Sequence, residues 1–403
     1  MTPRKVNFIN PYTEILIMSN FITTSSHCKS FLGVDLHTTA ATYAALDADS
    51  GALHKMTIPN HCTGKITRLV QSLKKPLCIG IESMGSYYWL WDMLKPLADE
   101  IHLIDALDLS KLRPRLADTD KIVAAKIAYI LKNELVPAAY VPPLEIRHLR
   151  MFGRQWHRIT QEAATIKTVV KWELYQANAR GPNTLSAAAL HRWLLANGEK
   201  LNVIQVGMLW QHYERIGIIE RQRDAILRSV RSIFKAHDNL AQALNILTTP
   251  KGISEVLGFI ILAEFGDFHR FKNADAVACW CGLTERTHMS NRQKYPGQIS
   301  KAGSATLRWA LCEAAFEMTK FDSGFRESHQ RLVKRTGVKG KARTAMARRL
   351  ARILWKMVVS ETPFRAGTNP DTAYQRANAV RQRRKGRQQK RKEFSEKHQP
   401  AMA

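Results

Sequence analysis

The feature of the sequence that most constrains its fold is the order of apolar and helical segments between residues 31 and 105. Five apolar runs have the length of short strands, and they lie at residues 31–36, 42–46, 53–58, 76–81 and 101–105. The first three runs are separated by turn residues, as in an antiparallel meander. Two segments with helical spacing separate the later runs, at residues 66–73 and 86–97. The sequence therefore predicts a mixed α/β domain at residues 31–137.

Two of the predicted strands end in an acidic residue. The order of three strands, helix, strand, helix and strand is that of an RNase H-like fold, in which the first and fourth strands are neighbours. Asp35 ends the first strand and Glu82 ends the fourth. A carboxylate at the end of a buried strand is costly unless it is paired or binds a cation. We therefore expect Asp35 and Glu82 to face one Mg²⁺ ion, although either acid alone has an ordinary structural explanation.

A third acidic motif, Asp118-Thr119-Asp120, stands at the start of a helix that the spacing predicts over residues 119–135. Its acids are further candidate ligands, because two-metal phosphoryl chemistry uses several carboxylates. Aspartate is also favoured at helix N-termini through capping alone. The occurrence of three acidic motifs in this order makes a functional interpretation the better one.

The rest of the chain is predicted to be mainly helical. Helical periodicity at residues 144–177 and 206–247 indicates an arm of two helices, which suits a spacer or a dimer contact. A last helical domain is interrupted by a polar loop at residues 284–301. The expected organisation is a disordered extension, an α/β domain, a helical arm, a helical domain and a basic disordered tail, at residues 1–30, 31–137, 138–243, 244–360 and 361–403.

The chain carries a large positive charge, since 61 Lys and Arg against 34 Asp and Glu give a net charge of +27. From Arg331 to the last residue, 21 basic residues stand against four acidic ones. This excess indicates a polyanionic partner, nucleic acid before a membrane surface. No apolar run reaches the roughly 18 residues of a membrane helix. The six cysteines are scattered, which is typical of a reducing compartment, so we expect a cytoplasmic protein.

Six motifs in a fixed order carry a resemblance to a known family. In the N-terminal half they are Phe31-Leu-Gly-Val-Asp-Leu-His37, Ile79-Gly-Ile-Glu-Ser-Met-Gly85 and Asp118-Thr-Asp-Lys-Ile-Val-Ala124. In the C-terminal half they are Ala263-Glu-Phe-Gly-Asp-Phe-His-Arg-Phe271, Cys281-Gly-Leu-Thr284 and Ile299-Ser-Lys-Ala-Gly-Ser-Ala-Thr-Leu-Arg308. The set resembles the insertion-sequence transposases whose RuvC-like domain carries a DEDD tetrad, the family that includes the pilin-gene invertases.

The resemblance implies roles for individual residues. Asp35, Glu82 and Asp120 fall on the first three acids of the tetrad, so they are expected to be catalytic and to hold Mg²⁺. The fourth acid normally follows the third by one helical turn, where this sequence has Val123. Ser290 falls on the serine that the family is proposed to use as the nucleophile on DNA. The implied activity is DNA cleavage and strand transfer of an insertion sequence.

The resemblance also implies contacts to nucleic acid. The expected contact residues are Gly252, Arg286, Arg292, Lys301 and Arg308. Gly252 lies in a segment that resembles the turn of a helix-hairpin-helix element, where free backbone N–H groups suit DNA phosphates. The implied partners are the DNA of the element ends and target, a structured guide RNA, and further copies of the chain in a homodimer or tetramer. The implied location is the nucleoid of the cytoplasm.

Two alternative functions remain open at this stage. A degenerate transposase would bind nucleic acid without cutting it, and Val123 at the fourth tetrad position favours that hypothesis. A junction-resolvase-like nuclease would hydrolyse DNA with water and would not need Ser290. Mg²⁺-dependent nicking by the native chain would exclude the degenerate transposase. Full activity after Ser290→Ala, with no protein–DNA adduct, would favour the nuclease over the transposase.

Overall fold

The computed structural model describes residues 21–22, 27–83, 85, 87–106, 109, 120–134, 136–290 and 293–365, with backbone only at residues 21–22, 286–290 and 293–298. The segments predicted to be disordered, residues 1–30 and 361–403, lie mostly outside the described residues. Within them the structure describes residues 21–22, 27–30 and 361–365, and residues 21–22 and Ser30 lie in strands, which the prediction of disorder did not anticipate. The chain divides into two compact units, residues 1–141 and 142–403, and each is described by itself.

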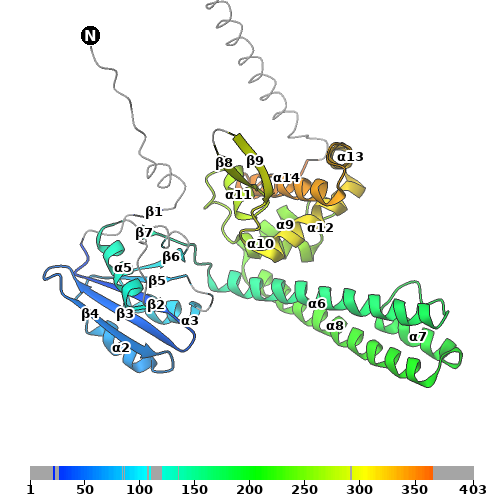
Figure 1. Cartoon of the computed structure of the whole chain (residues 1–403), viewed down its shortest axis with the longest axis horizontal. Helices are drawn as coiled ribbons and strands as arrows, with labels where there is room; N and C mark the ends of the chain where they lie inside the picture. Colours follow the sequence, from blue (N-terminus) through cyan, green and yellow to red (C-terminus); the bar gives the residue numbers. More distant parts are fainter. Residues whose placement is uncertain are drawn as a thin grey trace, which may run out of the picture. The chain divides into compact units, whose positions relative to one another are not determined.

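A five-stranded sheet forms the centre of the first unit (Figure 1). Its strands are β2 (Ser30–Leu36), β3 (Ala40–Asp47), β4 (Leu53–Pro59), β5 (Leu77–Glu82) and β6 (Glu100–Ile104). They lie in the order β4-β3-β2-β5-β6. Strands β2, β3 and β4 are antiparallel, and β5 runs parallel to both β2 and β6. The five predicted strands are confirmed, and so is the prediction that the first and fourth lie side by side.

Helices cover both faces of this sheet. Because strand side chains alternate between faces, Leu32 and Ile79 pack with two helices on one side. Phe31 and Ile104 pack with Leu131 of a third helix on the other side. The helices of the first face are α2 (Thr63–Gln71) and α3 (Tyr88–Leu94, continued by the 3₁₀ turn η1, Lys95–Leu97), and that of the second is α5 (Asp120–Lys132). A short pairing of β1 (Phe21–Ile22) with β7 (Val136–Pro137) completes the unit.

Gly33 allows α5 to lie directly on β2. A Cβ atom at Gly33 would stand 2.0 Å from the carbonyl oxygen of Ala124 and 2.7 Å from the backbone nitrogen of Ala128. No side chain fits at such distances, so only glycine permits this contact between helix and strand. The close approach holds α5 against the same strand that carries Asp35 two residues later.

Two long helices form an arm in the second unit (Figure 1). They are α6 (Leu144–Gln176) and α8 (Val203–Ala236), with α7 (Ala187–Asn197) and the turn η2 (Gly198–Lys200) between them. The predicted helix over residues 206–247 is wrong at one point. His237 adopts an extended conformation, with φ −136° and ψ 90°, so α8 ends there and α9 (Asp238–Leu247) begins. None of the described helices, these two long ones included, is apolar enough over its length to cross a membrane.

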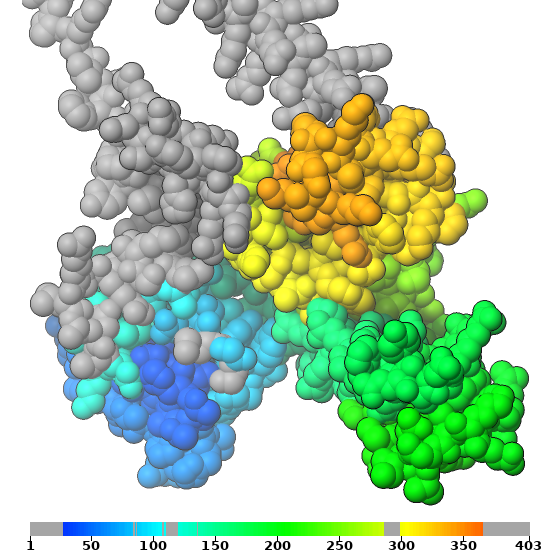
Figure 2. Space-filling view, turned by 45° about the vertical axis from the view of Figure 1, so that its right-hand side comes forward, coloured from blue at the N-terminus to red at the C-terminus, as the bar shows by residue number. Residues whose placement is uncertain are grey.

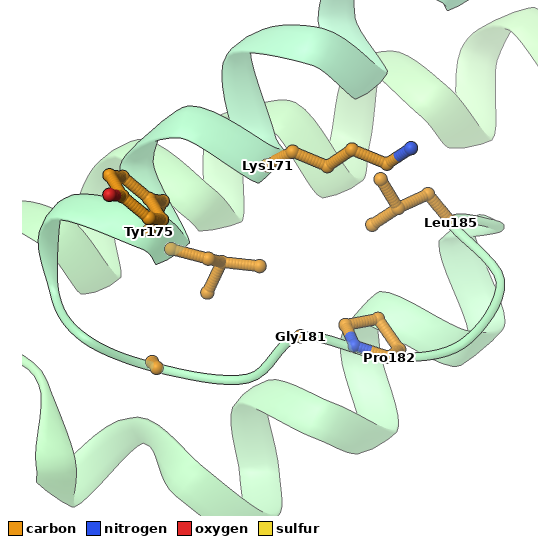
Figure 3. Close-up of a pocket in the computed structure, with 7 residues that line it drawn as sticks. Lys171, Tyr175, Gly181, Pro182 and Leu185 are labelled. Carbon is orange, nitrogen blue, oxygen red and sulfur yellow. The ribbon is translucent and has the colours of Figure 1, made fainter.

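The loop after α6 folds back on its own helix and forms a small pocket of about 250 Å³ (Figure 3). A Cβ atom at Gly181 would stand only 2.6 Å from Cδ1 of Leu174. The pocket is thus a result of close packing between the loop and the helix, and none of the predicted site residues lines it. Its lining residues are Lys171, Leu174, Tyr175, Ala179, Gly181, Pro182 and Leu185.

The remaining helices form one compact body, coloured yellow to orange in Figure 2. They are α9, α10 (Glu255–Phe265), α11 (Ala274–Trp280), α12 (Ala305–Phe321), α13 (Ser323–Thr336) and α14 (Lys339–Val359). The predicted polar loop at residues 284–301 is instead a hairpin of β8 (Glu285–Ser290) and β9 (Gln293–Ile299). Hydrogen bonds between the paired backbones form whatever the polarity of the side chains, so polarity alone did not reveal these strands.

Ionic and hydrogen-bonded contacts join the arm to this body. Arg150 of α6 donates from Nε to the carbonyl oxygen of Ala263, at 2.7 Å. Arg154, one helical turn further on, donates two hydrogen bonds to the carboxylate of Glu264, at 2.8 and 3.1 Å. The Glu264 side chain is only 3% exposed. Because a buried carboxylate needs a partner charge, this pair fixes where α6 meets α10.

Candidate functional site

The structure brings Asp35 and Glu82 together at the ends of two neighbouring parallel strands. Val34 is paired with Ile81, so each acid is the next residue along its strand. Both residues are buried, with 3% and 7% of their surface exposed. Their carboxyl groups share a hydrogen bond. The predicted pairing of these two acids is confirmed.

Asp120 joins the cluster from the first turn of α5, where its side chain is 62% exposed. The link is His37, whose Nε2 atom lies 3.4 Å from a carboxylate oxygen of Asp35 and 3.3 Å from one of Asp120. Asp35, His37 and Asp120 each offer a ligand atom within 4.8 Å of the other two. The close contact of α5 with Gly33 keeps the first turn of the helix near the end of β2.

Burial and neighbouring charges act in opposite directions on Asp35. Removal from water raises the pKa of its carboxyl group, and the negative charge of Asp120 adds to this effect. The charge of His37 and the hydrogen bond with Glu82 lower the same pKa. A bound cation would stabilise the ionised carboxylates directly. The site therefore has the electrostatic character of one that gains from positive charge.

His37 is the residue that sequence reasoning missed. It lies two residues after Asp35, just beyond the end of β2, and its backbone N–H donates to the carbonyl oxygen of Ala40 in a tight turn. The spacing Asp-x-His at a strand end was a usable signal, because side chains two residues apart point to the same face. In the sequence, His37 stood out only as the last residue of the motif at residues 31–37.

Val123 occupies the fourth tetrad position and lies in the hydrophobic core. Its side chain is 6% exposed and belongs to the cluster that α5 forms with the sheet, together with Ile104 and Ile127. A valine there has a clear packing role and offers no ligand atom. Asp118, the nearest other acid, lies outside the described residues.

Ser290 is the last residue of β8, paired with Gln293 across the end of the hairpin. Arg286 lies on the same strand, where the pairing shifts register between Glu285 and Thr287. The structure describes only the backbone of Ser290 and Arg286, and Arg292 lies outside the described residues. The nucleophilic role of Ser290 and the contacts of both arginines stay predictions.

Gly252 lies in the turn between α9 and α10, as the predicted helix-hairpin-helix-like element requires. Its φ of +109° is a conformation that other residues rarely adopt. A Cβ atom there would also stand 2.8 Å from the backbone nitrogen of Met318 in α12. Packing against α12 is thus sufficient reason for the glycine, and a phosphate contact at Gly252 stays a prediction.

Lys301 and Arg308 flank the loop between the hairpin and α12. Arg308 donates from its guanidinium to the carbonyl oxygens of Ala302 and Gly303, both at 3.0 Å. Lys301 is exposed and its backbone N–H donates to Gly282. Arg308 therefore stabilises the loop itself, and a phosphate contact at the exposed Lys301 stays a prediction.

Comparison with known proteins finds a match to a family profile in the C-terminal half of the chain. Residues 244–330, which run from the end of α9 into α13 and include the hairpin, match the profile of the transposase IS116/IS110/IS902 family. A Pseudomonas aeruginosa protein named as a probable family 20 transposase is 29% identical over 157 residues. A Sinorhizobium fredii protein named as transposase y4rJ is 27% identical over 248 residues.

These matches are partial on both sides. They cover 38% and 57% of this chain, and 43% and 62% of the two relatives. The chain thus spans less than two thirds of the length of the curated relatives that it matches. Residues 244–330 nevertheless match the profile of the transposase IS116/IS110/IS902 family, and the chain is similar to proteins named as transposases.

Proposed function

We propose that this chain is a DNA transposase that cleaves and rejoins the strands of an insertion sequence. The observation that carries the proposal is the cluster of Asp35, Glu82, His37 and Asp120 in a chain that also holds a transposase domain. Grouped carboxylates at strand ends cost stability unless a function needs them. The strand order β4-β3-β2-β5-β6 supports an RNase H-like, RuvC-like fold for the first unit, as expected for the DEDD transposases and pilin-gene invertases.

The acidic cluster fits Mg²⁺, because hard cations prefer carboxylate oxygens. Asp35, Glu82 and Asp120 would hold the ion. When bound, Mg²⁺ neutralises charge on the scissile phosphate and on the oxygens that attack and leave it. His37 contacts both Asp35 and Asp120 and so orients their carboxylates before any ion arrives. The raised pKa of Asp35 marks a carboxyl group that gains from a nearby positive charge.

Ser290 would act as the nucleophile on DNA in this proposal. Its Oγ atom would form a bond to phosphorus and lose its proton, while the bridging oxygen of the DNA strand leaves as a free hydroxyl. Attack by a hydroxyl of another strand would then release the serine. Support comes from its place in the matched domain, at the end of β8. Ser290 would need activation to attack phosphorus, because a serine hydroxyl is a weak nucleophile at neutral pH.

Nucleic acid is the proposed partner because of the net charge of +27. Both DNA and a structured guide RNA fit this charge, and affinity for either should fall steeply with salt.

We also propose that the arm joins copies of the chain. Trp172 and Tyr175 stack on each other while 59% and 76% exposed, and Val203 is 84% exposed. Apolar surface of this kind marks interaction sites.

A second candidate function is binding without cleavage, and the burial of Val123 favours it. Only three acids of the tetrad are present, and the core contact of Val123 leaves the fourth place without a carboxylate. Such a chain would bind element DNA with the same salt dependence but would produce no nicks with Mg²⁺ present.

The test is a recombination assay in cells, using an element with its native flanks. The native chain should excise and insert the element, and Asp35→Asn and Ser290→Ala should each abolish both events. Asp224→Asn and Ser323→Ala, at exposed positions on the arm and on α13, are the matched controls and should stay active. An inactive native chain that still binds the DNA would support the second candidate. Full activity and no protein–DNA adduct after Ser290→Ala would support a water-using nuclease instead.

A further inference from the structure

A second group of reactive side chains lies on the α5 face of the sheet. Cys78, Glu100 and His102 each place a ligand atom within 4.8 Å of the other two. Cys78 is paired with Glu100 across β5 and β6, and His102 is two residues further along the same face of β6. Cys78 and Glu82 are four residues apart on β5, about 13 Å at the rise of a strand. The group is therefore separate from the acidic cluster.

Cys28 adds a second thiol from a third segment. It precedes β2 and is 5% exposed, and its sulfur shares a hydrogen bond with that of Cys78, which is fully buried. The side chains of His102 and Glu100 keep 15% and 27% of their surface exposed. A second thiol thus lies beside Cys78, next to the group of Cys78, Glu100 and His102 but outside the set whose ligand atoms all lie within 4.8 Å of one another. The group opens to solvent on the side of Glu100.

Hydrophobic packing explains only part of this group. A buried cysteine behaves as a small apolar residue and needs no ligand. Apolar packing does not explain the imidazole and the carboxylate beside the buried thiols, because polar groups gain nothing from apolar surroundings. Nε2 of His102 lies 3.4 Å from a carboxylate oxygen of Glu100, and both residues face Cys78. A metal ion accounts for all four side chains at once.

We propose that Cys78, Glu100 and His102 bind one zinc ion and that Cys28, the hydrogen-bonded neighbour of Cys78, completes its coordination. Thiolate and imidazole ligands select zinc over magnesium, and four protein ligands are the usual number at a structural zinc site. The acidic cluster at the other end of β5 offers mainly carboxylate oxygens and suits the hard cation instead. The two ends of one strand would thus hold metals of different kinds. This inference does not depend on the proposed function.

The ion would join three segments of the first unit: β5, β6 and the residues that precede β2. Glu100 and His102 belong to β6, which is at the edge of the sheet, while Cys28 stands before β2 in the centre. Zinc binding requires the thiols to lose their protons and adds its binding free energy to folding. Removal of the ion should therefore loosen the β6 edge and lower the melting temperature of this unit.

The experiment measures zinc in the full-length protein purified under reducing conditions. Elemental analysis and native mass spectrometry should find a single zinc ion per chain. Cobalt(II) added to the chelated protein should produce the absorption band of thiolate coordination, and excess Mg²⁺ should not remove it. Loss of even an orienting partner weakens metal binding about 10- to 100-fold. Cys28→Ser, Cys78→Ala and His102→Asn should therefore each lower zinc affinity at least tenfold.

Controls separate the ligands from other residues of the same type. Cys279→Ser and His54→Asn change an exposed cysteine and an exposed histidine elsewhere in the chain, and both should bind zinc like the native protein. Cys78→Ala keeps an apolar group in the core, so this variant should stay folded. Circular dichroism checks the fold, so that a folding defect is not mistaken for the loss of a zinc ligand. The proposal is overturned if the native protein binds no zinc, if the variants bind it as tightly, or if Cys28 and Cys78 are found linked by a disulfide in the protein purified under reducing conditions.

Discussion

The imidazole of His37 lies 3.3 Å from the carboxylate of Asp120 and so connects the end of β2 with the first turn of α5. The same nitrogen lies 3.4 Å from Asp35. A cation bound by these two carboxylates must compete with, or rearrange, the contacts of His37. The ring of His37 therefore reports directly on whether the cluster binds metal.

We expect Mg²⁺ to shift the imidazole NMR signals of His37 in a saturable manner. The measurement is a titration of the metal-free protein, with the exposed His54 on β4 as the internal control, whose signals should not move. Asp120→Asn should weaken the response of His37, and Asp35→Asn combined with Glu82→Gln should remove it. Equal shifts of His37 and His54 would instead indicate a general effect of ionic strength, and the cluster would lose its assignment as a magnesium site.

The burial of Val123 leads to a prediction about restoring the tetrad. Val123→Asp would place a carboxylate in the core between α5 and the sheet, where the side chain is 6% exposed. Burying an unpaired charge is strongly unfavourable, so unfolding free energy should fall by at least about 2 kcal/mol. Ile122→Asp, at the neighbouring position with 38% exposure, should cost about 1 kcal/mol or less. Urea denaturation of both variants makes the comparison.

A stable Val123→Asp protein with new Mg²⁺-dependent cleavage would contradict this expectation. It would mean that the first turn of α5 can rotate its new carboxylate toward Asp35. The chain would then be a binder that lacks one side chain for cleavage, as the second candidate function holds.

Much of the first unit could be predicted from sequence, because its strands and helices have distinct apolar patterns. The pairing of Asp35 with Glu82 followed from strand order alone. The contact of His37 with Asp120 could not be predicted, since it depends on how α5 lies on Gly33. The group around Cys78 was missed for a similar reason. Cys78 lies more than 20 residues before Glu100 and His102 in the sequence, and the register of β5 with β6 brings the three together. Cys28 lies 50 residues before Cys78.

The second unit was harder to predict where local structure depends on backbone alone. The break at His237 separates two helices whose sequences both favour a helix, and the hairpin at Glu285–Ile299 lacks the apolar pattern of a buried strand. Neither feature is recorded in the spacing of apolar residues. The role of Gly252 shows the opposite case, in which a correctly predicted turn has a structural explanation that sequence could not supply.

The pair of Arg231 and Glu255 leads to a prediction about pH. Arg231 of α8 donates two hydrogen bonds to Glu255 at the start of α10, at 2.9 and 2.7 Å, and holds the pKa of that carboxyl below its ordinary value. A lowered pKa contributes stability above the ordinary pKa of glutamate, and this contribution is lost as the pH falls through the lowered value. Acid should therefore weaken this contact between α8 and α10.

Arg231→Ala should return the pKa of Glu255 toward its ordinary value, measured by carbon NMR of the carboxyl group. The stability difference between native and variant should be present near neutral pH and vanish in acid. The Arg231 side chain is 62% exposed and that of Glu255 37%, so water and salt screen the pair, and the difference should be small and should shrink in high salt. Arg228→Ala, an exposed position one turn earlier on α8, is the matched control. An unchanged Glu255 titration in Arg231→Ala would mean that the contact does not persist in solution.

Gly252 carries the last prediction, because two independent features of the turn require a glycine there. Its φ of +109° is strained for any residue with a Cβ atom, and that atom would stand 2.8 Å from the backbone nitrogen of Met318. Gly252→Ala should therefore lower the free energy of unfolding by about 2 kcal/mol or more. Gly340→Ala is the control, since Gly340 is helical and has open space around it. That variant should be as stable as the native protein or more stable, by up to about 1 kcal/mol.

Equal stability of the two variants would show that α12 does not press on the turn. Loss of DNA affinity in a fully stable Gly252→Ala protein would instead assign this glycine to phosphate binding.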